Sequence, residues 1–134
     1  MEKRILVVED EHSIAHLIAY NLEQVGYCTA TATTGGEALR LVESFSPHLL
    51  TLDLLLPRQS GWQVLGAIRA HPRRQIATLP VIVVSALASP KLQEELRRNG
   101  VRYCLGKPFS VTELCVLVNT VMLTCADPGW ASPV

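Results

Sequence analysis

The stretch Leu49-Leu50-Thr51-Leu52-Asp53 decides the fold, because it is a short, mainly apolar run that ends in a carboxylate. Apolar runs without polar alternation are typical of strands covered on both faces, which indicates a parallel sheet. An ionised, unpaired carboxylate at the mouth of a buried strand would cost several kcal/mol of desolvation. Asp53 therefore requires a cation or hydrogen-bond donors nearby, and we expect it to serve chemistry.

Two other apolar runs, residues 5–8 and 81–84, match the one before Asp53, and weaker strand patterns cover residues 27–32 and 102–105. A segment of helical period follows each strand. These segments are residues 12–25, 35–45, 61–70, 90–99 and 110–124. The connections are too short for anything but right-handed crossovers. Five strand–helix units therefore predict a doubly wound α/β domain with a parallel sheet.

Local signals predict where the helices end and which faces they bury. Gly26 is suited to a helix C-cap, Ser89 to an N-cap before Pro90, and Ser110 with Glu113 has capping-box spacing. Residues 71–78 are expected to form a polar turn. The first helix is expected to bury one stripe, made of Ile14, Leu17, Ile18, Leu22 and Val25.

Composition excludes several functions. The 134 residues are 49% apolar and 18% charged, with 12 basic residues against 12 acidic ones. This balance gives no electrostatic footprint for nucleic acid or an anionic membrane. No apolar stretch reaches the roughly 18 residues that span a bilayer, and no signal-peptide core follows the N-terminus. We expect one cytoplasmic domain over residues 1–125, followed at 126–134 by an irregular tail or the start of a linker.

The cysteines and histidines do not indicate a metal site of their own. No C-x-x-C pair occurs among the four cysteines, so we expect reduced thiols. His12 and His16 have the i, i+4 spacing of a metal-binding pair, but a solvated helix face is the better interpretation.

Polar side chains stand at the ends of four predicted strands, where the ligand site of such a sheet lies. They are Glu9, Asp10, Asp53, Ser85 and Lys107. Crowded carboxylates repel one another unless a cation neutralises them, and hard oxygen ligands favour Mg²⁺ or Mn²⁺. We therefore predict a divalent-cation site in which Glu9, Asp10 and Asp53 act as ligands or their partners. The backbone carbonyl of Leu55 is expected to complete it.

A metal held by carboxylates with open positions commonly meets phosphate. Asp53 would then be the nucleophile that forms an aspartyl phosphate. Ser85 could donate a hydrogen bond to one phosphoryl oxygen, and Lys107 could place its ammonium on another. Core packing gives no reason to put all these groups at one edge, so their joint placement favours function over loop caps and solvated charges.

Five motifs stand in a fixed order over residues 3–124: Ile5-Leu-Val-Val-Glu9-Asp10-Glu11, Leu52-Asp53-Leu-Leu-Leu-Pro57 with Gly61, Val84-Ser85-Ala86, Gly100, and Lys107-Pro108-Phe109. In this order and spacing they resemble the receiver domain of two-component response regulators. The resemblance is nearest to receivers of winged-helix transcription regulators.

This resemblance implies a flavodoxin-like (βα)5 fold with strand order 2-1-3-4-5. It implies Mg²⁺-dependent phosphotransfer from a phosphohistidine of a sensor histidine kinase to Asp53. Such a domain is no enzyme in the ordinary sense, although it assists its own phosphorylation and dephosphorylation. The resemblance also implies that Ser85 follows the phosphoryl group and repositions the face formed by residues 90–99, 102–105 and 110–124.

The sequence departs from this family at the switch position. Three residues before the lysine of the fifth strand, the family usually has an aromatic side chain, and this chain has Cys104. Tyr103 precedes it, but side chains alternate along a strand, so Tyr103 should face the opposite side of the sheet. The charged residues that join dimers of winged-helix regulators are also missing after Gly100 and in the final helix.

The final helix is instead apolar on nearly all sides. Its expected core stripe consists of Val111, Leu114, Val118 and Val121. Val116 and Leu123 fall on the far side, and Leu117 flanks the stripe. Such a helix should be covered on nearly all sides. We expect either an apolar homodimer interface or the tail containing Trp130 to cover it.

Three functions remain open at this stage. The first is a phosphoaccepting switch, and the second is a receiver that serves as a constitutive dimerisation or interaction module. The third is an aspartate-nucleophile phosphohydrolase, which normally needs a second acid two residues after the nucleophile, where this chain has Leu55. No stretch resembles a DNA-reading helix-turn-helix, so we expect either that the protein acts alone through contacts or that these residues are the front of a longer chain. The expected partners are a sensor histidine kinase and a second copy, without direct nucleic acid or membrane binding.

Overall fold

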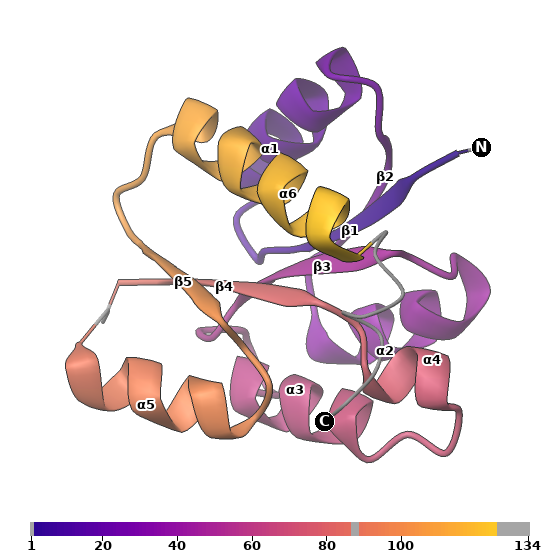
Figure 1. The fold of residues 1–134 in the computed structure, drawn as a ribbon, viewed down its shortest axis with the longest axis vertical. Coiled ribbons are helices and arrows are strands. Elements are labelled where there is room, and N and C mark those ends of the chain that lie inside the picture. The colour runs from indigo at the N-terminus through magenta and orange to yellow at the C-terminus, as the bar shows by residue number, and fades with distance from the viewer. Residues whose placement is uncertain (1, 87–88, 126–134) are drawn as a thin grey trace.

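A computed structural model of the chain describes residues 2–86 and 89–125, and strands and helices alternate along it (Figure 1). The elements are β1 (Arg4–Val8), α1 (His12–Gln24), β2 (Cys28–Ala32), α2 (Gly35–Ser44), β3 (Leu49–Asp53), α3 (Gly61–Arg69), α4 (Arg74–Ala77), β4 (Val81–Ser85), α5 (Pro90–Arg98), β5 (Tyr103–Gly106) and α6 (Val111–Cys125). Each predicted strand and helix has its counterpart, with ends that differ by at most one residue.

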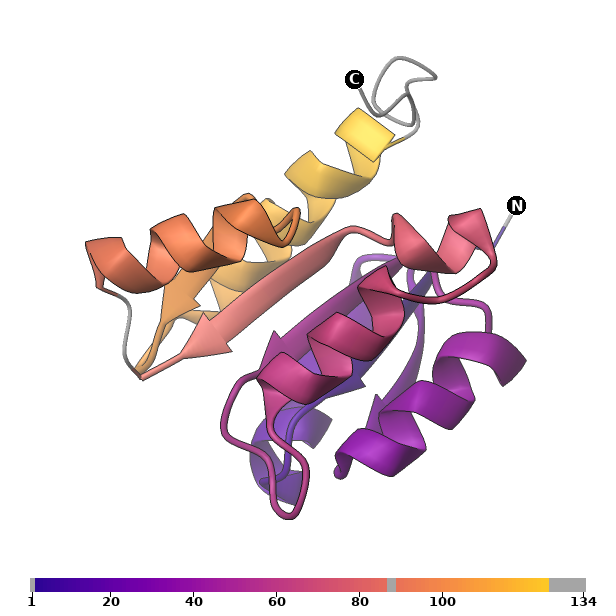
Figure 2. The ribbon, with the colours of Figure 1, turned by 90° about the horizontal axis from the view of Figure 1, so that it is seen from below.

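The five strands form one parallel sheet in the order β2-β1-β3-β4-β5. The predicted doubly wound fold and strand order are therefore confirmed. Helices α1 and α6 cover one face of the sheet, and α2, α3 and α5 cover the other (Figures 1 and 2). The register pairs Val8 with Leu52 and Asp53 with Val84, so these strands end at one common edge.

Two hydrophobic clusters, one on each face of the sheet, hold the layers together. Alternate residues of β1 serve opposite clusters: Leu6 and Val8 pack toward α2 and α3, whereas Ile5 and Val7 pack toward α1 and α6. Each of these four side chains is at most 1% exposed. Full burial of one such side chain stabilises a fold by roughly 1.5–3 kcal/mol. The central strands are buried on both faces, as their unbroken apolar runs predict.

Helix starts follow the capping signals. The Ser60 hydroxyl accepts a hydrogen bond from the backbone N–H of Gln63 at 3.3 Å, and the Gln63 side chain accepts one from Ser60 N–H at 2.9 Å. This reciprocal pair is a capping box at the start of α3. The Ser89 hydroxyl caps α5 ahead of Pro90, as predicted. Both caps fix helix starts close to strand ends at the functional edge of the sheet.

Arg69, at the end of α3, ties several loops together through its half-buried side chain. It donates hydrogen bonds to the backbone carbonyls of Asn99 at 2.7 Å, Leu79 at 2.8 Å and Ala77 at 3.1 Å, with a longer one to Gly100. Burial lowers the pKa of Arg69. Because the carbonyls precede β4 and β5, this one side chain secures the entry to both strands.

Three sequence predictions about the helices were wrong in part. Leu17 and Val25 are each 51% exposed, because the buried face of α1 consists of Ala15, Ile18, Ala19 and Leu22. Residues 71–78 are not only a polar turn, since they contain α4 and bury Ile76. In α6, Val111 is half-buried, and Met122 joins the core beside Leu114, Val118 and Val121.

Tyr103 and Cys104 face opposite sides of the sheet, as predicted. Tyr103 packs against the cluster beneath α1 and α6, whereas Cys104 packs against the cluster beneath α2, α3 and α5. Val116 and Leu123 lie on the outer face of α6, at 60% and 71% exposed. The tail prediction for residues 126–134, including Trp130, lies outside the described residues. Within the described ranges, no helix combines the length and apolar character that crossing a membrane requires.

Candidate functional site

The predicted residues meet where β1, β3, β4 and β5 end. Glu9 directly follows β1, Asp53 ends β3, and Lys107 directly follows β5. The Lys107 Nζ atom lies 3.0 Å from Glu9 Oε1 and 3.0 Å from Asp53 Oδ2. Both carboxylates are buried, with side chains 2% and 4% exposed. The cation that Asp53 requires is therefore supplied by a residue 54 positions away.

Backbone donors hold the second oxygen of each carboxylate. The N–H of Leu55 donates to Asp53 Oδ1 at 3.0 Å, and the N–H of Glu11 donates to Glu9 Oε2 at 3.3 Å. Each donor lies two residues after its carboxylate, which is the geometry of an Asx-type turn for Asp53. All four oxygens of the two buried carboxylates thus have a hydrogen-bond donor.

Burial and hydrogen bonding shift the pKa values of Glu9 and Lys107. Burial raises the pKa of Glu9 from 4.5 to about 7; the hydrogen bond from Lys107 lowers it, and the charge of Asp53 raises it further. Burial also acts against the charged form of Lys107, but the hydrogen bonds to Glu9 and Asp53 outweigh it, so the pKa of Lys107 is raised. One ammonium therefore compensates two carboxylates incompletely, and the site favours a further cation.

Asp10 completes a cluster whose chemistry fits a hard divalent cation. One carboxylate oxygen from each of Glu9, Asp10 and Asp53 lies within 4.8 Å of the others. Asp10 is more exposed than the other two. Carboxylate oxygens are the donors that Mg²⁺ and Mn²⁺ prefer. The three predicted metal residues are therefore brought together, while a role for the Leu55 carbonyl stays a prediction.

Ser85 ends β4 beside Asp53. It is 3% exposed, and its backbone carbonyl accepts a hydrogen bond from Lys107 N–H at 2.8 Å. Because Asp53 pairs with Val84, the next residue along β4 is at the same edge. Leu55, two positions after Asp53, is 64% exposed at this edge.

Gly61 is a positioning residue whose role the sequence analysis missed. Its N–H donates to the Leu54 carbonyl at 2.9 Å. A Cβ atom at Gly61 would lie 2.5 Å from both the Asp53 carbonyl oxygen and Leu54 Cα. Only glycine lets the start of α3 approach the end of β3 this closely. The fixed spacing between Asp53 and Gly61 was the available signal.

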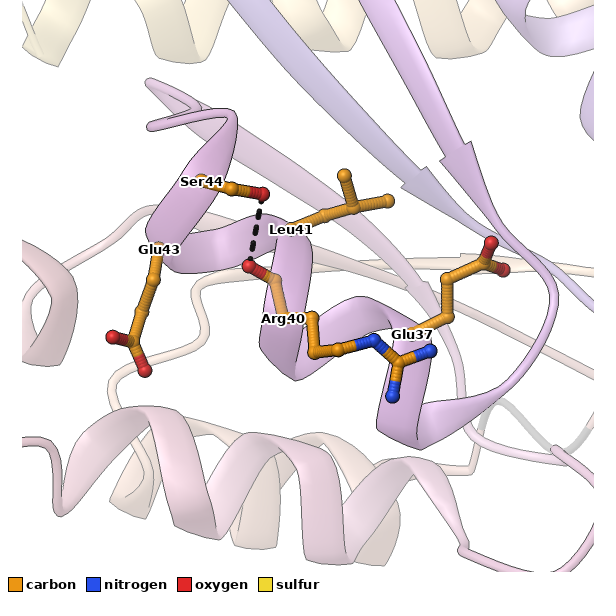
Figure 3. A pocket seen from close by; sticks show the side chains of 5 residues that line it. All are labelled: Glu37, Arg40, Leu41, Glu43 and Ser44. Atoms are coloured by element: carbon orange, nitrogen blue, oxygen red, sulfur yellow. Dashed lines mark hydrogen bonds between the residues drawn. The ribbon is translucent and has the colours of Figure 1, made fainter.

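A separate hollow of about 630 Å³ lies along α2 (Figure 3). Its lining comes from one helix, and the Ser44 hydroxyl within it donates to the Arg40 carbonyl at 3.1 Å. None of the predicted site residues lines it. The strand-end cluster is therefore the better candidate, because it alone combines the predicted carboxylates and amine.

Comparison with known proteins gives the family. The model of the response regulator receiver domain matches residues 5–119. The chain belongs to the response regulator receiver family. It is thus a receiver domain of the kind used in two-component systems, in which receivers accept phosphoryl groups, bind Mg²⁺ at an acidic pocket and interact with sensor histidine kinases.

Similar proteins include transcription regulators about twice as long as this chain and one protein of similar length. The receiver is 35% identical over 122 residues to the alkaline phosphatase synthesis transcriptional regulatory protein PhoP of Bacillus subtilis (strain 168), covering 91% of this chain and 49% of PhoP. An uncharacterized 14.6 kDa protein of Leptolyngbya boryana is 34% identical over 119 residues, with 89% of each chain covered. The chain spans about half the length of the transcription regulators it matches.

Solved structures agree with the fold. The signal receiver domain of a putative Luxo repressor protein from Vibrio parahaemolyticus has a TM-score of 0.85 and 30% identity, with 94% of both chains covered. The Francisella response regulator 1452 receiver domain has a TM-score of 0.80 and 32% identity, covering 90% of this chain and 96% of that one.

Proposed function

We propose that this receiver accepts a phosphoryl group on Asp53 from a phosphohistidine of a sensor histidine kinase, in the cytoplasm and with Mg²⁺. The observation that carries the proposal is the contact of Lys107 Nζ with Asp53 Oδ2 at 3.0 Å, beside the carboxylates of Glu9 and Asp10. Core packing offers no reason to gather three carboxylates and an amine at one strand edge. A phosphoryl group and its metal ion need this combination.

The transfer uses these side chains in defined roles. An Asp53 carboxylate oxygen bonds to phosphorus while the bond from phosphorus to the histidine nitrogen breaks, and the nitrogen retains the electron pair. Lys107 then shifts its ammonium from the carboxylate to a phosphoryl oxygen, and Ser85 donates a hydrogen bond to another. Mg²⁺ held by Glu9, Asp10 and Asp53 would offset the negative charge of the phosphoryl group.

The output of the proposed switch is a change in the face formed by α5, β5 and α6. Ser85 ends the strand that leads to α5, and β5 leads to Lys107, so both phosphate contacts adjoin this face. Val116 and Leu123 give its α6 side an exposed apolar stripe. We propose that a second copy binds there, and that this segment acts through protein contacts without binding nucleic acid directly.

A second candidate function is a constitutive interaction module. Cys104 replaces the aromatic side chain that usually couples phosphorylation to this face, and the apolar stripe of α6 requires no phosphate to bind a partner. Beryllofluoride with Mg²⁺ separates the two functions. A change of oligomeric state by analytical ultracentrifugation supports the switch, whereas an unchanged state at full site occupancy supports the module. The phosphohydrolase alternative has no support at Leu55, which supplies no acid.

Acetyl phosphate provides the test of phosphorylation itself. With Mg²⁺, the intact protein should gain the mass of one phosphoryl group, and Asp53→Ala should gain none. Removing Mg²⁺ with EDTA should slow the gain strongly. Persistent labelling of Asp53→Ala to the wild-type level would refute the proposal.

A further inference from the structure

Strand β5 runs between α5 and α6 at the edge of the sheet (Figure 2). A hollow with both polar and apolar walls is lined by residues of these three elements. It holds about 280 Å³, and Leu96, Cys104 and Leu117 supply its apolar walls. Pockets for drug-sized ligands begin at about 300 Å³. The hollow is therefore suited to one large side chain rather than to a sizeable free ligand.

The small side chain at position 104 leaves this space open. Cys104 is half-buried and points toward the α5 side of β5. Burial raises the pKa of its thiol, so it lines the hollow as a neutral, apolar group. A larger side chain at this position would project into the same space. The hollow therefore has room for an aromatic ring from another segment.

The rim of the hollow is basic. Arg97 and Arg102 both line it and are exposed. On α5, Glu94 pairs with Arg98 at 3.3 Å, and Arg97 has no ion-pair partner within the described ranges. Arginine guanidinium groups pair with carboxylates and stack on aromatic faces. The hollow therefore favours an occupant that combines an aromatic ring with an acidic group.

Residues 126–134 carry this combination. The sequence after Cys125 is Ala126-Asp127-Pro128-Gly129-Trp130, which has one acid, then one aromatic ring, with Pro-Gly between them. Pro-Gly is a turn signature, which suits a chain that must reverse direction after a helix. The segment holds no other charged side chain and no other aromatic one.

The end of α6 leads directly to the hollow. Thr124 borders a small hollow of about 20 Å³ that shares Arg102 and Tyr103 with the larger one. Leu117 lies seven residues before Thr124, which is about 10 Å along a helix axis. Five extended residues from Cys125 to Trp130 span up to about 17 Å. Trp130 can therefore reach the hollow after one reversal of the chain.

We propose that residues 126–134 fold back along β5, with the Trp130 indole in the hollow and Asp127 beside Arg97 and Arg102. The tail then covers part of the face formed by α5, β5 and α6 and competes with partners for it. Docking requires no phosphoryl group on Asp53, so its test is independent of the proposed function.

Fluorescence quenching tests this docking. Trp62→Phe leaves Trp130 as the sole tryptophan, because the chain contains two. Acrylamide should quench Trp130 several-fold less efficiently in the protein than in a synthetic peptide of residues 124–134. In the same background, Cys104→Phe should fill the hollow and raise quenching toward the peptide level. Cys104→Ala is the matched control, since it leaves the space open and should preserve protection.

Arg97→Glu keeps the test decisive if Cys104→Phe fails to fold by circular dichroism. Arg97 is exposed, so its replacement should leave the fold intact while repelling Asp127 and raising quenching. Quenching equal to that of the free peptide in the unmutated tail would overturn the proposal. So would protection that folded Cys104→Phe or Arg97→Glu leaves unchanged. Protection that disappears on dilution, together with a dimer in sedimentation, would assign the hollow to the tail of a second copy instead.

Discussion

Glu9→Gln should change how stability depends on pH when Mg²⁺ is absent. The wild-type folded state holds Glu9 with a pKa raised from 4.5 to about 7, chiefly because the side chain is buried. A group with a raised folded pKa contributes stability that is fully present below its unfolded pKa and is lost as the pH rises through its folded pKa. The wild type should therefore lose this stability between about pH 4.5 and about pH 7.

The size of the effect follows from the shift. A rise of about 2.5 pKa units corresponds to about 3 kcal/mol at about 1.4 kcal/mol per unit. The free energy of unfolding of the wild type should therefore fall by up to about 3 kcal/mol relative to that of Glu9→Gln across this window. Lys107 does not alter the sign, because its raised pKa keeps it charged throughout.

Urea unfolding followed by circular dichroism measures this difference, with EDTA present and at several pH values across the window. Glu11→Gln is the matched control, since it removes the same charge from an exposed neighbour and should keep the wild-type slope. Millimolar Mg²⁺ should flatten the wild-type fall, because metal binding favours ionised carboxylates. Parallel pH profiles for wild type and Glu9→Gln would refute the reasoning.

Three substitutions test the supports of the site and of the strands that lead to it. Lys107→Ala leaves two buried carboxylates without their cation, so the free energy of unfolding should fall by roughly 3 kcal/mol at neutral pH and recover in part with Mg²⁺. An unchanged free energy in urea unfolding would contradict the ion-pair argument. Gly61→Ala places a Cβ 2.5 Å from the Asp53 carbonyl oxygen, so it should lower the free energy of unfolding by about 1–3 kcal/mol and slow phosphorylation. Gly66→Ala is the control: its surroundings are open, so it should stabilise α3 by up to about 1 kcal/mol. Arg69→Met removes the guanidinium from four backbone carbonyls and should lower the free energy of unfolding by roughly 3 kcal/mol. The folded variant should still react with acetyl phosphate at the wild-type rate. Equal thermal stability of the variant and the wild type would show that these hydrogen bonds do not stabilise the fold.

The sheet and the strand-end cluster were predictable because both follow from short-range patterns. An unbroken apolar run that ends in a carboxylate identifies a buried parallel strand, and parallel strands bring their carboxyl ends to one edge. Glu9, Asp10, Asp53 and Lys107 therefore converge in space although they are distant in sequence. Three carboxylates and an amine at one edge are suited to a divalent cation and a phosphoryl group.

Other features depend on neighbours that a sequence pattern does not specify. Leu17 is exposed because α1 turns Ala15, Ile18 and Leu22 toward the sheet, and the sequence pattern alone fits more than one such rotation. Arg69 donates its hydrogen bonds to backbone carbonyls, which every residue carries, so no side-chain motif in the sequence predicts them. The raised pKa of Glu9 reflects the depth of its burial, which only the packed structure determines.

Mapping the phosphoryl group tests the central claim most directly. After reaction with acetyl phosphate and Mg²⁺, borohydride reduction converts an aspartyl phosphate to homoserine, and tandem mass spectrometry of the digested protein locates it. The proposed function predicts homoserine at position 53 in the wild type, with no reduced side-chain carboxyl at Glu9 or Asp10 and no homoserine in Asp53→Ala. Modification at another carboxylate, with Asp53 intact, would contradict the assignment of Asp53 as the phosphoacceptor.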